Sequence, residues 1–265
     1  MQIGFFDSGI GGITVLHKAL KMIPDEDYLY YADSAHVPYG EKSKEEVKDY
    51  VFSAVDFMVQ KGIKALVVAC NTATSAAIED LRKKYDFPVI GMEPAVKPAV
   101  EFVGNSDKRV LVFATELSLK EEKFQNLIKK VDPRHIVDYI PLPKLVYFAE
   151  QGRFDSSEAE EYLKNVLSRV PMESYGAVVL GCTHYPYFYG LFRRLLPEGI
   201  LLIDGNRGTV KNLKRILEQR GNIPEGSGFV EFYASGRKIT DKEELDRYCR
   251  LVKRLDDLET EGVKG

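Results

Sequence analysis

The alternation of short apolar runs with helical patterns along nearly the whole chain is the feature that most constrains its fold. Each apolar run has the length of a buried strand, and the segments between them repeat apolar residues at the spacing of one helix face. We interpret as strands the segments 3–6, 28–32, 63–69, 89–91, 109–114, 136–140, 177–181 and 201–203. Because strands that alternate with helices form parallel sheets covered on both faces, the sequence predicts an α/β fold.

Helix start signals support this interpretation. The capping-box pattern, in which Ser or Thr is followed three residues later by Glu, occurs at Ser43 with Glu46, Ser118 with Glu121, Ser157 with Glu160 and Thr240 with Glu243. The first of these leads into an apolar stripe made of Val47, Val51, Ala54, Val55 and Met58. Gly62 is placed to end that helix.

Two of the predicted strands lead into a cysteine. Residues 66–72 and 178–184 are each an apolar run that stops at a thiol and then a small polar residue. Cys70 and Cys182 are therefore expected at the carboxyl ends of buried strands, where open α/β sheets bind their ligands. Two thiols that face each other across a cleft suit a reaction that needs a base on one side of a carbon and an acid on the other.

The surroundings of the two cysteines indicate a duplicated plan. In each half an early strand runs into a turn, at 6–8 and at 113–115, and a later strand ends in Cys. We expect two pseudo-equivalent α/β domains, each a mainly parallel sheet flanked by helices, with the active site in the cleft between them. The first domain comprises residues 1–95 plus 207–265, and the second comprises 96–206. The chain crosses between them near 94–98, and the segment after Asp204 returns to the first domain.

Composition excludes several classes of protein. The net charge is −3 and the basic residues are scattered, so there is no electrostatic footprint for nucleic acid. Hydrophobic residues make up 45% and charged residues 29%, as in ordinary globular proteins. No apolar stretch reaches membrane-spanning length, and the N-terminus lacks the pattern of a secretory signal. We expect a cytoplasmic protein without membrane or nucleic-acid partners.

No metal site and no disulfide are predicted. Three cysteines cannot all pair, and Cys-x-x-Cys and His-x-x-x-His spacings are absent. Cys249 falls on a helical stripe and is interpreted as a core residue together with Leu245, Tyr248, Val252 and Leu255. His17 and His135 are expected at the surface. His36 stands beside the loop 38–40 and is expected to shape the pocket.

The glycine-rich segment 7–12 directly follows the first strand and opens a helix. Gly9 and Gly11 lack the third glycine of the dinucleotide fingerprint, and there is no phosphate-binding P-loop. Two interpretations stay open for the glycines, a tight strand-to-helix turn or direct contact with a ligand. Asp7 lies at the same predicted sheet edge as Cys70.

Four motifs together resemble the glutamate racemases of the aspartate/glutamate racemase superfamily. They are Asp7-Ser8-Gly9, Ala32-Asp33 followed by Pro38-Tyr39-Gly40, residues 68–74 and residues 180–186, in the order and spacing of that family. The resemblance implies cofactor-independent interconversion of L-glutamate and D-glutamate, which supplies D-glutamate for peptidoglycan. It also implies a homodimer.

The resemblance further implies the roles of five residues in proton transfer. Cys70 acts on the proton of D-glutamate and Cys182 on that of L-glutamate. Asp7 assists Cys70, whereas His184 and Glu150 assist Cys182. A helix start or a cation can lower the pKa of a thiol so that a thiolate serves as the base. Because a carboxylate raises the pKa of a neighbouring thiol, Asp7 is better suited to relay a proton, and His184 is the more natural activator.

Substrate binding requires donors for two carboxylates and acceptors for an ammonium group. Ser8, Asn71, Thr72 and Thr183 lie at strand-to-helix junctions, where backbone amides favour anions. The resemblance adds Tyr39, Gly40, Thr74 and Thr115, and it includes Asp7 and His184 among the binding residues. Ser118 is assigned to its capping box instead.

The chain departs from the family pattern at three places. Residues 115–118 keep the Thr but lack the glycine that usually follows it. Before Glu150 only Pro143 is well placed, and Tyr147 stands where a second proline is usual. Asp204-Gly205 replaces a frequent Asp-Ser, so Asp204 is given no ligand role.

Alternatives from other classes remain open at this stage. A thiol hydrolase or acyltransferase would pair Cys182 with His184, although residues so close along the chain seldom adopt that geometry, and it would not require Cys70. A binding protein on the same scaffold would act on a partner such as gyrase. A racemase of another amino acid, such as aspartate, would share the fold and both thiols.

Overall fold

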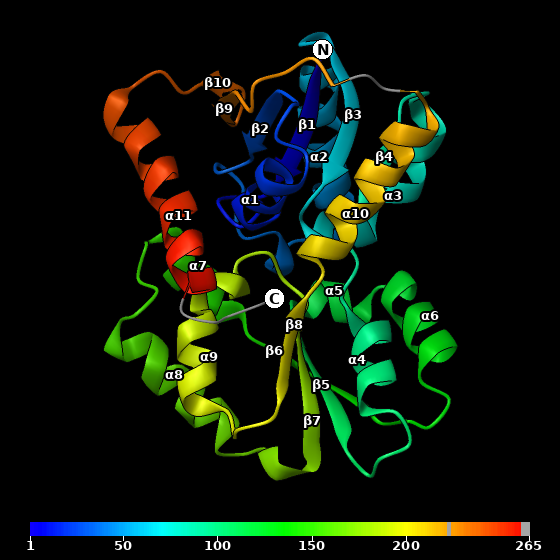
Figure 1. The fold of residues 1–265 in the computed structure, drawn as a ribbon, viewed down its shortest axis with the longest axis vertical. Helices are drawn as coiled ribbons and strands as arrows, with labels where there is room; N and C mark the ends of the chain where they lie inside the picture. Colours follow the sequence, from blue (N-terminus) through cyan, green and yellow to red (C-terminus); the bar gives the residue numbers. More distant parts are fainter. Residues whose placement is uncertain (222–223, 261–265) are drawn as a thin grey trace.

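The computed structural model describes residues 1–221 and 224–260, and in it two sheets lie end to end (Figure 1). The strands are β1 (Gln2–Asp7), β2 (Tyr28–Ala32), β3 (Ile63–Val68), β4 (Val89–Gly91), β5 (Arg109–Ala114), β6 (Val137–Pro141), β7 (Tyr175–Leu180), β8 (Leu201–Asp204), β9 (Val230–Ala234) and β10 (Arg237–Lys238). The first sheet has the order β10-β9-β2-β1-β3-β4, and the second has the order β6-β5-β7-β8.

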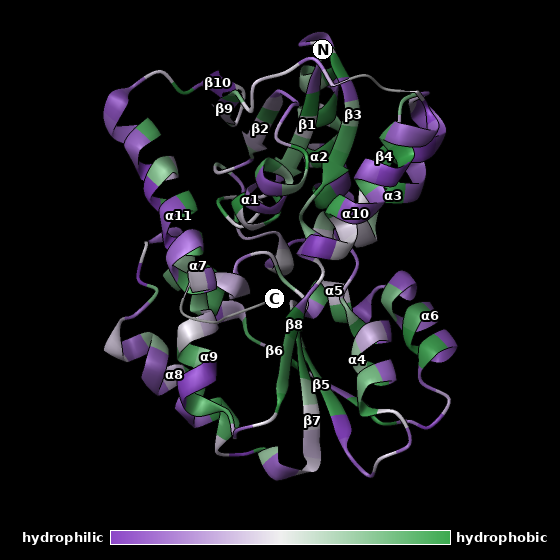
Figure 2. Cartoon of the chain, in the orientation of Figure 1, coloured by the Kyte–Doolittle hydropathy of each residue, from purple (hydrophilic) through white to green (hydrophobic). Residues whose placement is uncertain are grey.

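Helices flank both sheets. They are α1 (Ile13–Met22), α2 (Lys44–Gln60), α3 (Asn71–Lys84), α4 (Val96–Val103), α5 (Glu116–Lys120), α6 (Glu122–Val131), α7 (Pro143–Glu150), α8 (Ser157–Leu167), α9 (Tyr189–Leu195), α10 (Asn206–Gln219) and α11 (Lys242–Thr260). Three short 3₁₀ turns complete this set, η1 (Tyr39–Glu41), η2 (Met172–Ser174) and η3 (Tyr185–Phe188). Figure 2 shows hydrophobic central strands and hydrophilic outward faces on helices such as α8 and α11.

The two sheets repeat one topology. The order β2-β1-β3-β4 in the first sheet matches β6-β5-β7-β8 in the second, and all of these strands pair in parallel. Even an irregularity recurs, since the register shifts at Gln2/Ile3 between β1 and β3 and at Arg109/Val110 between β5 and β7. The predicted α/β fold with two pseudo-equivalent units is confirmed.

All eight predicted strands are present, with bounds that differ by two residues or fewer. Two further strands were missed. β9 pairs in parallel with β2 and extends the first sheet, and β10 returns antiparallel to it. The sequence pattern of β9 is weak, because this strand is only partly buried and therefore lacks a continuous apolar run.

Two connections link the sheets, from β4 to α4 and from β8 to α10. They meet closely, because a Cβ added to Gly205 would lie 2.4 Å from the carbonyl oxygen of Glu93. After the second connection α10 packs on α1, so the chain does return to the first sheet. The domain boundaries at residues 95/96 and 206/207 stay a prediction.

The helix start signals were only partly correct. Ser43 and Glu46 form the complete capping box, the stripe from Val47 to Met58 is buried, and Gly62 follows the helix with φ +83°. The other three boxes were wrong by position. Ser156 caps α8 instead of Ser157, Asp241 accepts the first amides of α11 instead of Thr240, and Thr115 caps the short α5 instead of Ser118. In each case a different polar side chain nearby accepts the hydrogen bonds of the first helical amides.

Two predictions of burial were wrong. Cys249 is exposed, because the buried stripe of α11 runs through Tyr248, Leu251, Leu255 and Leu258, about one residue away around the helix. His17 is 2% exposed instead of lying at the surface, because α11 covers α1 at that point. His135 is exposed as predicted.

Within the described residues, no helix is both long enough and apolar enough to cross a bilayer.

We expect the same substitution to have opposite effects at two positions of α2. Ser43→Ala removes the capping box and should lower the free energy of unfolding by about 1 kcal/mol. Ser53→Ala, at an exposed position inside the same helix, should raise it by a few tenths of a kcal/mol, since Ala is the better helix former. Urea denaturation of both variants checks this, and equal effects of one sign would contradict the assigned cap.

Candidate active site

The side chains of the candidate site come from the carboxyl ends of equivalent strands. Asp7 ends β1 and Cys70 follows β3, whereas Thr115 follows β5 and Cys182 follows β7. The carboxyl ends of the two sheets face each other at the centre of the molecule (Figure 1). The topology therefore brings together residues that are far apart in the sequence.

Asp7 is completely buried and bridges the two halves. Its Oδ1 accepts the amide of Gly9 at 3.0 Å, and its Oδ2 accepts the hydroxyl of Thr183 at 3.0 Å. Burial raises the pKa of Asp7 to about 6, although the His184 charge and the two hydrogen bonds partly oppose this rise. The carboxyl group can therefore gain or lose a proton close to neutral pH.

Cys70 occupies the N-cap of α3. Its sulfur accepts the amide of Ala73 at 3.4 Å and donates to Ser8 Oγ at 3.8 Å. Burial, and then the nearby Asp7 carboxylate, raise the pKa of Cys70 to about 12. The helix start was expected to lower the pKa of Cys70, but burial and the Asp7 carboxylate outweigh that effect. Cys70 is therefore a protonated thiol in this structure.

A chain of hydrogen bonds leads from Cys182 to Glu150. The Cys182 sulfur lies 3.7 Å from His184 Nδ1, and His184 Nε2 lies 2.6 Å from Glu150 Oε1. The same Glu150 oxygen accepts the amide of Ile10 from the first half at 2.9 Å. His184 therefore contacts the thiol that it was expected to assist, in an arrangement that residues so close along the chain seldom adopt.

Electrostatics favour the charged forms of His184 and Glu150. Burial alone would lower the pKa of His184, but hydrogen bonds and charges from Cys182 and Glu150 raise it well above its ordinary value. Burial alone would likewise raise the pKa of Glu150, yet its hydrogen bond and attraction to His184 lower it. The site thus holds an imidazolium beside the Cys182 sulfur.

A cluster of hydroxyl groups joins the two halves on the other side. Thr72 Oγ1 lies 2.9 Å from Thr115 Oγ1 and 3.2 Å from Ser118 Oγ, and Thr115 and Ser118 also bond each other at 2.9 Å. Ser118 lies inside α5 and is 2% exposed, so its assignment as a helix cap was wrong. This three-residue cluster is a polar wall at the end of β5 and the start of α3.

The remaining predicted binding residues fall into two groups. Asn71 begins α3 and, with Ser118, lines a cavity of about 230 Å³, and Gly40 lies directly against Thr115. The side chains of two others already have internal partners. Tyr39 donates to Asp33 Oδ2 at 2.6 Å, and Thr74 donates to the carbonyl of Val68 and accepts the amide of Met92, both at 3.0 Å.

The loop 38–40, which carries Tyr39 and Gly40, is held by neighbouring residues of the first half. His36 beside it in the first half hydrogen-bonds Asp33 at 2.9 Å and stacks on Tyr50, so it shapes the loop 38–40. Asp204, which was given no ligand role, ends β8 and accepts the amide of Asn206, the first residue of α10, at 2.8 Å.

The glycines of segment 8–12 permit close contact with the second half. A Cβ on Gly9 would lie 1.9 Å from Glu150 Oε1. A Cβ on Gly11 would lie 2.3 Å from Thr183 Oγ1 and 2.7 Å from His184 Nδ1. Their small size therefore serves the approach of side chains from the other half, which is an interpretation that the sequence alone did not offer.

Three supporting residues were missed by sequence reasoning. Thr14 donates to the carbonyl of Thr183 at 3.1 Å, and Tyr187 donates to the carbonyl of Ile10 at 3.1 Å. Arg247 of α11 donates to the carbonyl of Glu150 at 2.7 Å. These residues bond backbone atoms of partners far away in the chain, so no local pattern marks them.

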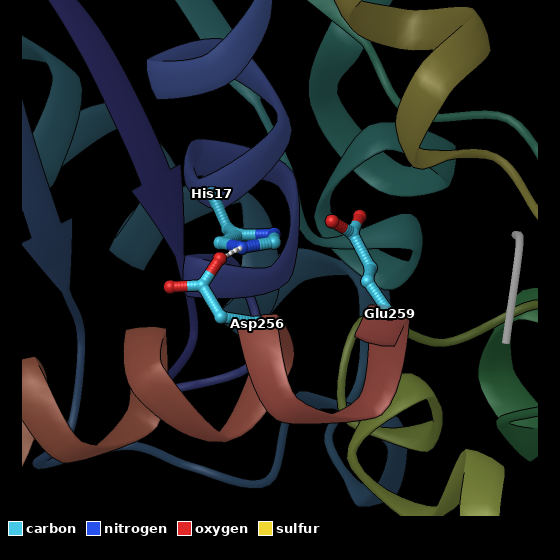
Figure 3. Close-up of side chains that lie close together, drawn as sticks. All are labelled: His17, Asp256 and Glu259. Atoms are coloured by element: carbon cyan, nitrogen blue, oxygen red, sulfur yellow. Dashed lines mark hydrogen bonds and ion pairs between the residues drawn. The ribbon is translucent and has the colours of Figure 1, made fainter. Parts of the chain in front are cut away.

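One cluster of potential metal ligands lies outside this site. His17, Asp256 and Glu259 offer ligand atoms within 4.8 Å of one another where α11 docks on α1 (Figure 3). His17 Nε2 bonds Asp256 Oδ1 at 2.9 Å, while Lys18 and Lys21 pair with the carboxylates. Because two ammonium groups already neutralise these carboxylates, the cluster is an ion-pair junction between helices.

Comparisons with known proteins agree on one family. The model of the Asp/Glu/Hydantoin racemase family matches residues 13–213. Glutamate racemase 2 of Bacillus subtilis is 52% identical over 99% of both chains, and the glutamate racemase of Halothermothrix orenii is 54% identical over 96% of this chain and 100% of its own.

Solved structures give the same result. The glutamate racemase of Thermus thermophilus, in complex with β-chloro-D-alanine, superposes with a TM-score of 0.76 at 34% identity and covers 96% of this chain and 92% of its own. The Escherichia coli glutamate racemase, in complex with L-glutamate and the activator UDP-MurNAc-Ala, has a TM-score of 0.77 at 28% identity, with 88% and 98% covered.

Gly11→Ala should disrupt the chain from Cys182 to Glu150. The added methyl group overlaps Thr183 Oγ1 and His184 Nδ1, so the imidazole must move away from its partners. We expect the pKa of His184 to fall towards its ordinary value, as measured by NMR titration of the imidazole. Gly208→Ala is the matched control, since a Cβ there meets nothing within 4 Å. An unchanged His184 titration in the Gly11 variant would show that the backbone around Gly11 moves instead of the imidazole.

Asp7→Asn should stabilise the protein in a pH-dependent manner. The pKa of Asp7 is raised from 3.8 to about 6 on folding, so between these values the folded state binds the extra proton and wild-type stability falls as pH rises. Asn avoids burial of that charge. The gain in the free energy of unfolding from Asp7→Asn should grow as the pH rises between these two pKa values. It should level off above about pH 6, at on the order of 2 kcal/mol. Urea denaturation at about pH 5 and about pH 8 measures it, and a gain that shrinks with rising pH would reverse the assigned sign.

Proposed function

The chain belongs to the Asp/Glu/Hydantoin racemase family, and on this premise we propose that it interconverts L-glutamate and D-glutamate by proton transfer between two thiols. One observation carries the two-thiol mechanism. Cys70 and Cys182 follow equivalent strands of two sheets whose carboxyl ends face each other (Figure 1).

The chemistry requires a base and an acid on opposite faces of the α-carbon. One group removes the α-proton, and the other delivers a proton to the opposite face, which inverts the configuration. The two thiols supply both groups without a cofactor. Their environments differ, since Cys70 is a protonated thiol beside a carboxyl group and Cys182 lies beside an imidazolium.

This difference assigns the starting roles. The imidazolium of His184 attracts the negative charge of a thiolate, so Cys182 is suited to begin as the base that takes the proton of L-glutamate. The Cys70 thiol then protonates the other face. The reverse reaction starts from the state that this transfer leaves, with Cys70 as the thiolate base and Cys182 as the thiol that protonates the other face, and Asp7, with its pKa near 6, is placed beside Cys70 to relay protons.

Binding of glutamate is supported by groups at the strand ends. The first amides of α3, at Asn71 and Thr72, have no carbonyl partner within the helix and suit a carboxylate. The hydroxyl groups of Thr72, Thr115 and Ser118 cluster at this position. Ser8 contacts the Cys70 sulfur at the N-cap, and Thr183 bonds Asp7 from the other half. Gly40 adds backbone close to Thr115. Tyr39 acts by holding Asp33, and Thr74 by tying α3 to the end of β3 and to Met92, which follows β4.

The cellular role follows from the substrate. D-glutamate made by this enzyme supplies peptidoglycan synthesis in the cytoplasm, and the enzyme acts as a homodimer. A Cys182–His184 hydrolase is the other candidate that a specific contact favours, since these two groups do lie 3.7 Å apart. A hydrolase would use only one thiol, whereas both thiols are presented here in the same way.

The three cysteines provide a matched test. Cys70→Ser and Cys182→Ser should each lower racemisation by about a thousandfold or more, because each removes one of two proton-transfer groups. Cys249→Ser should leave it unchanged, since Cys249 is exposed on α11. Proton NMR in deuterated water with L-glutamate follows loss of the α-proton, and circular dichroism follows loss of optical activity. Because the enantiomers have equal free energies, kcat/KM must stay equal in both directions for every variant.

Other outcomes point elsewhere. Full activity in both the Cys70 and the Cys182 variants would rule out the two-thiol mechanism. A thiol ester hydrolysis that survives Cys70→Ala would favour the hydrolase. Exchange with L-aspartate in place of L-glutamate would make the protein a racemase of another substrate.

A further inference from the structure

The candidate site is closed in this structure. Cys70 and Cys182 are 5% and 7% exposed, and Asp7 and His184 are 0% and 2% exposed. A substrate the size of glutamate cannot reach these groups unless the two halves separate. Contacts that join the halves at the rim of the site must therefore break and re-form in every catalytic cycle.

The outer rim of the site is open to solvent as a cavity of about 350 Å³, which we name the mouth. It is lined by residues of both halves, Pro38, Gly40, Glu41, Thr115, Glu116, Pro143 and Val146. Gly40 and Thr115 are also proposed binding residues. The mouth is thus the route by which the proposed substrate would approach.

One side-chain hydrogen bond spans the halves beside the mouth. The hydroxyl of Tyr147 in α7 donates to Oε2 of Glu41 in η1 at 2.6 Å. Glu41 directly follows Tyr39 and Gly40, and Tyr147 lies one helical turn before Glu150. The bond therefore ties the turn that carries two proposed binding residues to the helix that carries the partner of His184.

Tyr147 stands at one of the three places where the sequence departs from the pattern of the family that it resembles. No part of the proton-transfer mechanism uses Tyr147 or Glu41. Their contact is nevertheless a charge-assisted hydrogen bond, and this bond to Glu41 raises the pKa of Tyr147.

We propose that Tyr147 and Glu41 are a positioning pair for the reaction, which holds η1 against α7 and keeps the two halves closed at the spacing where the thiols flank the substrate. This inference rests on the proposed function for its role in catalysis, but the closure itself does not.

The pair is suited to open easily. Tyr147 is 42% exposed and Glu41 is exposed, so water replaces the lost bond when the halves separate. A second bridge lies nearby, where Lys44 at the start of α2 pairs with Glu121 between α5 and α6. Because this bridge remains, loss of the Tyr147 hydroxyl should increase opening without unfolding either half.

The test measures how often the cleft opens. Tyr147→Phe keeps the ring and removes only the hydroxyl. In the substrate-free protein, labelling of Cys70 and Cys182 by N-ethylmaleimide should become about threefold to tenfold faster, read residue by residue by mass spectrometry. Cys249 is exposed in either state and is the internal reference for reagent and protein quality. Tyr139→Phe, at another exposed tyrosine of the second half, is the matched control and should leave the ratio unchanged.

A double-mutant cycle identifies the partner. Glu41→Gln alone should accelerate cleft labelling to a similar extent, and the double variant should show no further increase, because both changes remove the same bond. Additive effects would mean that the residues act separately and would overturn the pair.

Kinetics separate this pair from a general loss of stability. Because the bond is present without substrate and is expected in the complex, its loss should leave KM for glutamate within about twofold while labelling accelerates. Unchanged labelling of both cleft thiols in the Tyr147 and Glu41 variants would overturn the proposal. Since labelling needs no substrate, it decides the closure even if wild-type protein fails to racemise glutamate, an outcome that would contradict only the proposed function.

Discussion

The close approach of the glycine segment 8–12 to the second half is the constraint on which the site depends. Through it Glu150 accepts the amide of Ile10, and Thr183 donates to Asp7. Neither half alone completes these bonds, because each contributes a donor to an acceptor of the other. A side chain at Gly9 or Gly11 would occupy the space that Glu150 and His184 now fill. The backbone of one half therefore fixes the electrostatics of the other, and the two strand ends act as one site.

The fold repeats, but the chemistry on its two sides does not. Both cysteines follow the third strand of the same four-strand topology, yet Cys70 faces a buried carboxyl group and Cys182 faces an imidazole. Burial penalises charge on both sides, and only the second side compensates it with an opposite charge. A symmetric framework thus holds an asymmetric distribution of protons. The proposed two-thiol mechanism needs this, since one thiol must be charged and the other neutral before each turnover.

The sequence predicted the parts of this molecule that depend on local pattern. Continuous apolar runs identified the eight buried strands, and the polar residues at their ends include most of the side chains that the candidate site brings together. Prediction from the sequence failed where contact with a distant segment determines the structure of a residue. His17 is buried because α11 covers it, β9 is a strand because β2 lies beside it, and Ser118 bonds Thr72 across the cleft instead of capping a helix. Cys249 was misplaced by a shift of about one residue in the apolar stripe of α11, which periodicity cannot resolve. Supporting contacts such as Arg247 to the Glu150 carbonyl left no trace in the sequence.

The pairing of β9 with β2 has a consequence for how the chain is made. During synthesis β2 emerges directly after its neighbour β1, but β9, its neighbour on the other side, emerges only after the whole second sheet. Until then the nascent first sheet has an unpaired edge, which is a surface that can pair with other chains. The last helix then covers α1 through the junction of His17 with Asp256. Assembly of the first half is thus completed last, so a ribosome that stalls beyond the second sheet would release a chain whose site residues are all present while the sheet that holds half of them is unfinished.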